Sequence, residues 1–255
     1  MKEISSSPRI IRLAETESTN NYMHGLLEKE ALPEGVVIVA DFQSHGKGQV
    51  GNSWESEAGK NLMFSVLLHP DFLPANQQFL ISQISALAVQ QMLETFAKPV
   101  FVKWPNDIYW NDKKICGMLI ENDIAGTKLI NSIIGIGVNI NQKKFYSNAP
   151  NPVSLTQITG NEYDLCEMLN IFLSCFFKLY NTLMQGANEV IRNLYFASLY
   201  RGKGYHLFND ANNEFEACIQ NVEPSGHLTL ALRNGEKKRY AFKEVSFVMK
   251  SLKSS

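Results

Sequence analysis

One polar stretch of the sequence, DFQSHGKGQVGNSWES at residues 41–56, combines closely spaced glycines with a lysine. Glycine has no side chain, so the backbone N–H groups beside Gly46, Gly48 and Gly51 can turn towards an anion. Lys47 adds a positive charge at the same place. This combination is typical of a phosphate-binding loop. An ordinary glycine-rich hairpin with Lys47 facing solvent would have the same composition, and the spacing is not that of a P-loop.

A second polar group lies in KWPNDIYW, residues 103–110. Pro105 cannot donate a hydrogen bond within a regular strand, so a bend is expected that turns Asn106 and Asp107 into a cleft beside Lys103. Lysine and aspartate together could position and balance charge in a reaction. An exposed pair of this kind at the end of a strand would instead contribute little to stability.

Three more stretches carry groups that could bind a ligand. In KKICGMLIEN, Lys114 precedes a strand in which Gly117 permits close approach of a ligand or another backbone. In GIGVNIN, Gly135 and Gly137 expose one face of the backbone, and Asn139 offers a donor and an acceptor suited to a purine edge. The alternatives are a solvated lysine pair at a turn and a glycine-containing strand beside a bulky neighbour.

A helix start and a tryptophan complete the candidates. ESTN, residues 17–20, offers hydroxyl and N–H groups that could bind a polar ligand or simply form an N-cap. Trp54 could stack on a flat ring, although a single tryptophan could equally pack in the core.

The elements that would carry these motifs follow from hydrophobic periodicity. Apolar and β-branched runs predict strands at 10–15, 35–43, 61–70, 100–110, 113–122 and 128–141. Apolar residues at helical spacing predict helices at 18–30, 77–96, 164–185 and 188–200. We therefore predict an α+β domain over residues 1–202. After Gly204, short strands separated by turns predict a small β-barrel, closed or nearly closed, over residues 203–255.

Composition excludes several classes of protein. Lys and Arg number 24 against 25 Asp and Glu, so no strong field attracts nucleic acid or an anionic membrane. No apolar run is long enough to span a bilayer, and no signal peptide is evident. The four cysteines form no C-x-x-C pair, which favours a reducing cytoplasm. None of the five histidines has the spacing of a metal site, so no structural metal is expected.

Taken in order, ESTN, FQSHGKGQVGNSW, KWPNDIYW, KKICGMLIEN and GIGVNIN resemble the motifs of biotin protein ligases, also called biotin-[acetyl-CoA-carboxylase] ligases. The most specific part is KWPND followed seven residues later by a lysine and then x-x-G. The resemblance implies a catalytic domain with a mixed β-sheet and flanking helices, followed by an SH3-like barrel. It also implies an activity in which biotin and MgATP form biotinyl-5'-AMP, whose biotinyl group passes to a lysine of a biotin carboxyl carrier protein.

The resemblance also assigns roles to residues of this chain. Those implied for biotin are Ser18, Thr19, Asn20, Gln43, Lys47, Gly48, Gln49, Lys114, Gly117, Gly135 and Gly137. Those implied for ATP are Gly46, Lys47, Asn52, Trp54, Asn106, Lys114 and Asn139. The implied reaction centre comprises Lys114, Asp107, Lys103 and Lys47. We expect the Lys47 and Lys114 amines to meet where the biotin carboxylate approaches the α-phosphate, because two anions must be neutralised there.

Some features of the resemblance leave alternatives open. A lipoate or octanoyl ligase-transferase of related fold, or a biotin-sensing module without turnover, would have a similar pocket. Sequence similar to the catalytic domain begins near residue 9, so no DNA-binding winged helix-turn-helix is expected before it. Neither nucleic acid nor a membrane is an expected partner. A homodimer formed by pairing of sheet edges is possible.

The glycine loop departs from the common family pattern G-R-G-R-x-G-R, because Lys47, Gln49 and Asn52 replace its three arginines. Arginine grips phosphate in a bidentate manner and lysine does not. We therefore predict that Gln49→Arg slows dissociation of the adenylate, measured as the off-rate of labelled biotinyl-5'-AMP. An unchanged off-rate would contradict the hypothesis that the missing arginine charges matter.

Overall fold

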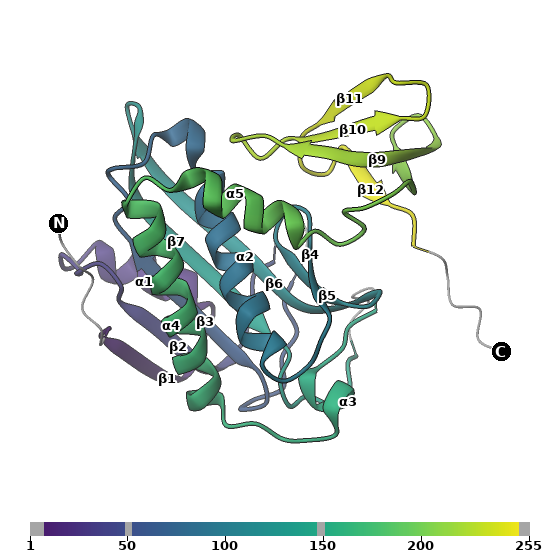
Figure 1. Ribbon diagram of the computed structural model, residues 1–255. Helices are drawn as coiled ribbons and strands as arrows, with labels where there is room; N and C mark the ends of the chain where they lie inside the picture. The colour runs from purple at the N-terminus through teal and green to yellow at the C-terminus, as the bar shows by residue number, and fades with distance from the viewer. Residues whose placement is uncertain (1–7, 49–52, 147–150, 250–255) are drawn as a thin grey trace.

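Two β-sheets form the framework of the protein (Figure 1). The structure is a computed structural model and describes residues 8–48, 53–146 and 151–249. Within these residues, the larger sheet has the strand order β1-β2-β3-β7-β6-β5-β4, and the smaller has the order β11-β10-β9-β8-β12.

The larger sheet is mixed, because β1 pairs with β2 in parallel and its other pairs are antiparallel. Its strands are β1 (Ile10–Thr16), β2 (Val37–Gln43), β3 (Leu62–Leu68), β4 (Val100–Lys103), β5 (Asp107–Trp110), β6 (Lys113–Ala125) and β7 (Lys128–Val138). The helices are α1 (Thr19–Leu27), the short 3-10 helix η1 (Ala75–Gln77), α2 (Phe79–Glu94), α3 (Leu155–Thr159), α4 (Leu165–Met184) and α5 (Asn188–Ala197).

Helices cover both faces of the larger sheet. In Figure 1, α2 and α4 lie in front of it and form the main core, in which Phe64 of β3 meets Phe172 of α4 at a ring-centroid distance of 4.8 Å. On the opposite face, Met23 of α1 packs with Ile38 and Leu67. Neighbouring residues of one strand thus contact different layers, which explains why β2 and β3 are almost continuously apolar.

Most predicted elements are confirmed, including the α+β class and the mixed sheet. The prediction of one bent strand over 100–110 is wrong, because residues 104–106 form a turn between β4 and β5. Lys103 and Asp107 are therefore partners across a hairpin. Helix α1 is shorter than predicted, and α3 and η1 were not expected. Asn111 adopts a left-handed conformation, with φ of 51°, in the predicted tight turn before β6.

The smaller sheet contains β8 (His206–Asp210), β9 (Glu214–Val222), β10 (Leu228–Leu232), β11 (Lys237–Tyr240) and β12 (Val245–Phe247). In the part of the chain that the structure describes, β11 and β12 are its two edges and are not hydrogen-bonded to each other. A short turn joins them, in which Glu244 N donates to Ala241 O at 3.2 Å. The barrel is therefore incompletely closed. The boundary between residues 202 and 203 stays a prediction.

The smaller sheet packs against the turn that follows β4. Trp104 Nε1 donates a hydrogen bond to Gly226 O at 2.9 Å, and its ring contacts the Phe242 ring with centroids 6.0 Å apart. Arg201 Nη1 also donates to Val248 O at 2.9 Å. These contacts place the β11–β12 turn next to the motif KWPND.

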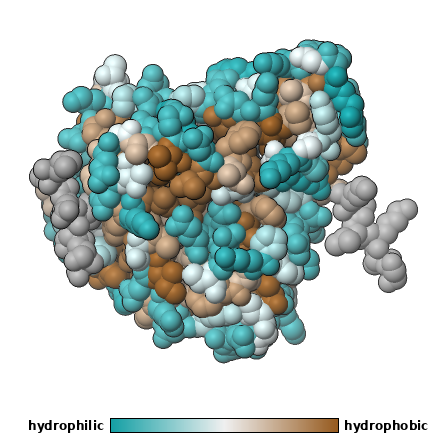
Figure 2. Space-filling view, in the orientation of Figure 1, coloured by the Kyte–Doolittle hydropathy of each residue, from teal (hydrophilic) through white to brown (hydrophobic). Residues whose placement is uncertain are grey.

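The surface in the view of Figure 2 is mostly hydrophilic, with hydrophobic side chains gathered in patches. Exposed apolar side chains include Val190 and Leu194 on α5. Among residues 8–48, 53–146 and 151–249, no helix is both long enough and apolar enough to cross a membrane. The longest helix, α4, carries a polar stripe that includes Asn170 and Lys178.

Tyr195 holds the β4–β5 turn in place from the side of α5. Its side chain is fully buried, and its hydroxyl donates to Pro105 O at 2.6 Å. Burial raises the pKa of Tyr195, so the hydroxyl keeps its proton and remains a donor.

We predict that Tyr195→Phe lowers the free energy of unfolding by about 1–2 kcal/mol, because the Pro105 carbonyl loses its partner. The corresponding decrease in Tm is roughly 2–8 °C, measurable by thermal or urea unfolding. Tyr146→Phe is the control, because Tyr146 is 82% exposed and its removal should change nothing. Equal stability of the two variants would contradict this role of Tyr195.

Candidate active site

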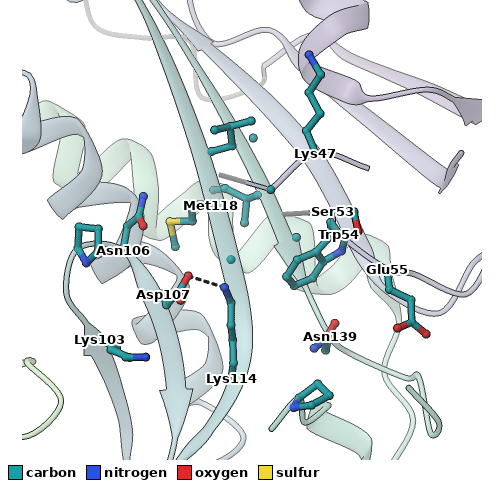
Figure 3. Close-up of a pocket in the computed structure, with 18 of the residues that line it drawn as sticks. Lys47, Ser53, Trp54, Glu55, Lys103, Asn106, Asp107, Lys114, Met118 and Asn139 are labelled. Atoms are coloured by element: carbon teal, nitrogen blue, oxygen red, sulfur yellow. Dashed lines mark ion pairs between the residues drawn. The ribbon is translucent and has the colours of Figure 1, made fainter. Parts of the chain in front are cut away.

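A cavity of about 630 Å³ lies between the two sheets (Figure 3). Its walls come from the start of α1, the end of β2, residues 47–48 and 53–55, the β4–β5 hairpin, β6, β7 and the β11–β12 turn. The predicted site residues that line it are Ser18, Thr19, Asn20, Gln43, Lys47, Gly48, Trp54, Lys103, Asn106, Asp107, Lys114, Gly117, Gly135, Gly137 and Asn139. Gly46 lies outside the lining. Gln49 and Asn52 lie outside the described residues.

The two ends of the glycine loop are joined by backbone pairing. Trp54 N donates to Gly46 O at 2.8 Å, and Lys47 and Ser53 form an antiparallel bridge. A Cβ atom at Gly46 would lie 2.5 Å from Trp54 O, so this position requires glycine. The loop base therefore resembles the glycine-rich hairpin that the sequence left open, and it directs Trp54 into the cavity.

The Trp54 indole lies directly on the glycines of β6 and β7. A Cβ atom would lie 2.4 Å from Trp54 Cε2 at Gly137 and 3.0 Å from Trp54 Cζ3 at Gly117. At Gly135, a Cβ atom would lie 2.4 Å from Asn20 Oδ1. The bulky neighbours that these glycines accommodate are thus side chains of the cavity itself. Direct contact of Gly117, Gly135 and Gly137 with biotin stays a prediction.

Lys114 and Asp107 form an ion pair at the centre of the cavity, with Nζ and Oδ1 2.7 Å apart (Figure 3). Their side chains are 29% and 27% exposed, so both can reach a ligand. The backbone of Lys114 is held on both sides, because its N–H donates to Asn151 O and its carbonyl accepts from Val153 N, each at 2.9 Å. The hairpin turn and the start of β6 thereby bring the two charges together.

Lys103 adds a second amine beside this pair. Its Nζ donates to the Tyr109 hydroxyl at 3.0 Å and lies 4.6 Å from the centre of the Tyr109 ring. Burial is the main cause that lowers the pKa of Lys103; Asp107 opposes this effect, and the positive charge of Lys114 adds to it. Tyr109 was not among the predicted site residues. Its contact with Lys103 depends on the hairpin, in which Tyr109 pairs with Phe101, and the sequence pattern did not predict this hairpin.

The expected meeting of the Lys47 and Lys114 amines is not seen. Lys47 Nζ donates to Asn21 Oδ1 at 2.6 Å, and in Figure 3 its side chain points away from Lys114 and Asp107. The bridge between Lys47 and Ser53 sets this direction, and Asn21 in the first turn of α1 supplies an uncharged acceptor. A ligand role for Lys47 stays a prediction.

Two buried polar atoms in the cavity wall lack partners among the described residues. Asn139 is 4% exposed, and its Nδ2 donates to Val153 O at 3.2 Å, which leaves Oδ1 unpaired. Trp54 Nε1 is also buried without an acceptor. Unpaired buried groups are costly, so such atoms suit a ligand that completes their hydrogen bonds. A flat heterocycle with an exocyclic amino group, such as adenine, offers a donor to Asn139 and a surface to Trp54.

The start of α1 forms another polar wall. Ser18 is the N-cap, but its side chain makes no capping hydrogen bond. Thr19 contacts Gln43 Oε1 through both its backbone N–H, at 2.8 Å, and its hydroxyl, at 3.2 Å. These contacts join the helix start to the end of β2, and a ligand role for Ser18, Thr19 and Gln43 stays a prediction.

The sequence did not predict the contribution of the smaller sheet. Phe242, Lys243, Val245 and Ser246 from the β11–β12 segment also line the cavity. Lys243 has a φ of 71°, which is unusual for a residue with a side chain. Their composition gave no signal for this role, because it depends on how the two sheets pack. In the described part of the chain, no cluster of three His, Cys, Asp or Glu side chains could hold a metal ion.

A mixed sheet and a small antiparallel sheet together line the candidate site. The model of the biotin/lipoate A/B protein ligase family matches residues 13–139. The bifunctional ligase/repressor BirA of Bacillus subtilis is 32% identical over 231 residues, which cover 88% of this chain and 70% of that protein. The chain belongs to the biotin/lipoate A/B protein ligase family, as its motifs indicated.

Two further relatives match almost their whole length. The biotin--[acetyl-CoA-carboxylase] ligase of Paracoccus denitrificans is 29% identical over 227 residues, covering 86% of this chain and 92% of that protein. The solved structure of the biotin protein ligase from Aquifex aeolicus in complex with biotin and ATP has a TM-score of 0.75 and 26% identity. That similarity covers 93% of this chain and 97% of the other.

The contact between Gly137 and Trp54 can be tested by fluorescence. We predict that Gly137→Ala displaces the indole into solvent and shifts the tryptophan emission to longer wavelength, because the new Cβ overlaps Trp54 Cε2. Introducing Gly137→Ala into a Trp54→Phe variant should abolish the shift. Gly25→Ala is the control, since a Cβ there meets nothing within 4 Å. An unchanged emission spectrum in Gly137→Ala would contradict the described packing.

Proposed function

We propose that this protein is an ATP-dependent ligase that activates biotin as biotinyl-5'-AMP and transfers the biotinyl group to a lysine of a biotin carboxyl carrier protein. The observation that carries the proposal is the Lys114–Asp107 ion pair inside a cavity that also presents Asn139 and Trp54. Support comes from the 26% identical Aquifex aeolicus ligase, whose structure holds biotin and ATP.

The first step joins two negatively charged groups. A biotin carboxylate oxygen attacks the α-phosphorus of ATP, a C–O–P anhydride forms, and pyrophosphate leaves. The Lys114 amine would contact both the carboxylate and the α-phosphate, and its positive charge offsets their repulsion. Lys103, which lies beside Asp107 in the hairpin register, would add positive charge. Mg²⁺ would arrive with the nucleotide and neutralise its outer phosphates.

The second step needs a neutral amine from the carrier protein. The carrier ammonium group gives one proton to solvent, and its neutral nitrogen attacks the carbonyl carbon of the anhydride. The C–O bond to phosphate breaks, AMP leaves with the bonding electron pair, and the nitrogen gives a second proton to solvent as the amide forms. When the acyl phosphate occupies Lys114, the Asp107 carboxylate would be available to hold the incoming ammonium group. Catalysis here consists mainly of positioning, because the acyl group is already activated.

The substrate groups would be distributed over the remaining walls. Ser18, Thr19, Asn20 and Gln43 would bind the ureido ring, while Trp54, Asn106 and Asn139 would bind the nucleotide base and ribose side. Lys47 would have to leave Asn21 to reach a phosphate, together with backbone groups of Gly46 and Gly48. Gln49 and Asn52, which lie outside the described residues, would complete that loop.

A homodimer is a further part of the proposal. Within the described chain β1 is an edge of the larger sheet and pairs with β2 alone. A second copy could therefore add its own β1 edge through backbone hydrogen bonds. Sedimentation of the purified protein across a range of concentrations would test this separately from activity.

The activity is tested by ATP–pyrophosphate exchange with biotin or lipoate, followed by transfer of labelled biotin to a carrier domain. We predict that biotin supports both exchange and transfer and that lipoate supports neither. Lys114→Met should lower the rate of ATP–pyrophosphate exchange by about 10²–10³-fold, the effect of removing a group that stabilises developing charge. Lys29→Met, at an exposed lysine on the surface, is the matched control.

Exchange with lipoate in place of biotin would favour the related lipoate or octanoyl ligase activity. Binding of biotin without exchange or transfer would instead favour a biotin-sensing module. Full exchange activity in Lys114→Met would contradict the role given to this lysine.

A further inference from the structure

A chain of close polar contacts runs behind the cavity wall at the start of α1. It links Glu121 on β6 to Asn20, Ser65, Thr19 and finally Gln43. Thr19, Asn20 and Gln43 line the cavity, whereas Glu121 and Ser65 do not. Ser65 is fully buried, and the Glu121 side chain is 34% exposed. The cavity is therefore connected to an acidic group that no ligand in it would touch.

The acidic group determines which way the Asn20 amide faces. Asn20 Nδ2 donates to Glu121 Oε2 at 2.6 Å and to Leu119 O at 3.3 Å, and neither a carboxylate nor a carbonyl has a hydrogen to give. The amide oxygen consequently faces the Ser65 hydroxyl, with Oδ1 and Oγ 2.6 Å apart. Close packing against Gly135 keeps the Asn20 side chain in place, so the motion left to it is a half-turn that exchanges the amide oxygen and NH₂ group, which are similar in size.

The other end of the chain is also an acceptor. Gln43 Oε1 receives the Thr19 backbone N–H at 2.8 Å, while Gln43 Nε2 lies 3.5 Å from the Met63 sulfur. The amide of Gln43 is therefore oriented with its oxygen towards Thr19. Both ends of the chain are then oxygen atoms without hydrogen, separated only by the Ser65 and Thr19 hydroxyls.

This arrangement has fewer hydrogens than contacts. Three oxygen–oxygen contacts of 2.6, 2.7 and 3.2 Å connect Asn20 Oδ1, Ser65 Oγ, Thr19 Oγ1 and Gln43 Oε1. Two hydroxyl groups supply only two hydrogens. The two shorter contacts need the hydrogens most, so we assign Ser65 as donor to Asn20 and Thr19 as donor to Ser65. The 3.2 Å contact between Thr19 and Gln43 is then left without a hydrogen. These two oxygens therefore retain acceptor capacity on the cavity side and suit a ligand that brings N–H groups.

We propose that Glu121 is a positioning residue that fixes this polarity through Asn20, and that it thereby makes the cavity select a ring bearing N–H donors. The inference rests on the proposed function, in which that ring is the cyclic urea of biotin. Glu121 acts without touching the ligand. Its outer side meets His24, whose Nε2 lies 3.6 Å from Glu121 Oε2.

The isosteric change Glu121→Gln alters the number of hydrogens in the chain. A glutamine can offer its NH₂ group to Asn20, which allows the Asn20 amide to turn and donate to Ser65. Ser65 then donates to Thr19, and Thr19 donates to Gln43. All three contacts then receive a hydrogen. Gln43 Oε1 accepts from both the Thr19 N–H and the Thr19 hydroxyl, and Thr19 Oγ1 accepts from Ser65, so the spare acceptor capacity facing the ligand falls. The variant keeps the size of the side chain, so packing is preserved.

The measurement compares biotin with two analogues, in each of which one ureido N–H is replaced by oxygen. For each ligand, kcat/KM is obtained from ATP–pyrophosphate exchange and Kd from calorimetry. We expect Glu121→Gln to lower the preference for biotin over at least one analogue by about 3- to 10-fold, the effect of one hydrogen bond. The KM for ATP should stay unchanged. A loss that affects all three ligands equally would overturn the proposal.

Two further variants keep the test decisive. Asp123→Asn removes a carboxylate from the same strand, where Asp123 is exposed and hydrogen-bonded to Asn131, and should leave the preference unchanged. Ser65→Ala interrupts the chain without changing Glu121 and should reduce the preference as Glu121→Gln does. If Glu121→Gln fails to fold, an unchanged preference in Ser65→Ala overturns the proposal.

The outcome can be separated from that of the proposed function. Wild-type protein that neither binds biotin nor supports exchange with it would overturn the ligase assignment, and this inference with it. If the wild-type protein is active and prefers biotin over the analogues no more than Glu121→Gln does, only the role of Glu121 is overturned.

Discussion

The absence of side chains at Gly135 and Gly137 of β7 is the constraint on which the cavity depends. Gly135 and Gly137 leave space that Asn20 and Trp54 occupy, and Gly117 on the paired strand β6 extends the same flat surface. Strands normally fill such a face with side chains, and here other elements supply them. Helix α1 and the segment after the glycine loop can therefore approach the sheet closely enough to form one wall with it.

The charges of the cavity follow from a single hairpin. The turn at 104–106 brings Lys103 opposite Asp107, and the next strand adds Lys114 on the other side of that carboxylate. Two amines beside one carboxylate leave a net positive charge. Burial disfavours the charged form of Lys103 and is the main cause that lowers its pKa, and the positive charge of Lys114 acts in the same direction while Asp107 opposes it. An anionic substrate would offset the net positive charge, which is the electrostatic basis of the proposed activity.

Sequence predicted the parts of the site that depend on local pattern. Strand and helix periodicity placed most elements, and the family resemblance of the ordered motifs named the fifteen described residues that line one cavity. It could not predict features set by packing between distant segments. Lys47 turned to Asn21 because a cross-loop bridge fixes its direction, and the β11–β12 turn reached the cavity because Trp104 docks on Gly226. Neither contact can be predicted from the local amino-acid composition.

The same strand face also orders the groups of a bound molecule. Residues 135, 137 and 139 alternate along β7 and its end, so they lie about 7 Å apart on one side. Asn20 and the hydrogen-bond acceptors beside it lie at residue 135. Trp54 lies at residue 137, with Lys114 nearby, and the unpaired oxygen of Asn139 lies at the third position. A ligand with N–H groups at one end, an anionic centre and an amino-bearing heterocycle at the other matches this sequence of sites. Biotinyl-5'-AMP has that order of groups. Lipoate, whose ring is a dithiolane, lacks the N–H groups required at the first position.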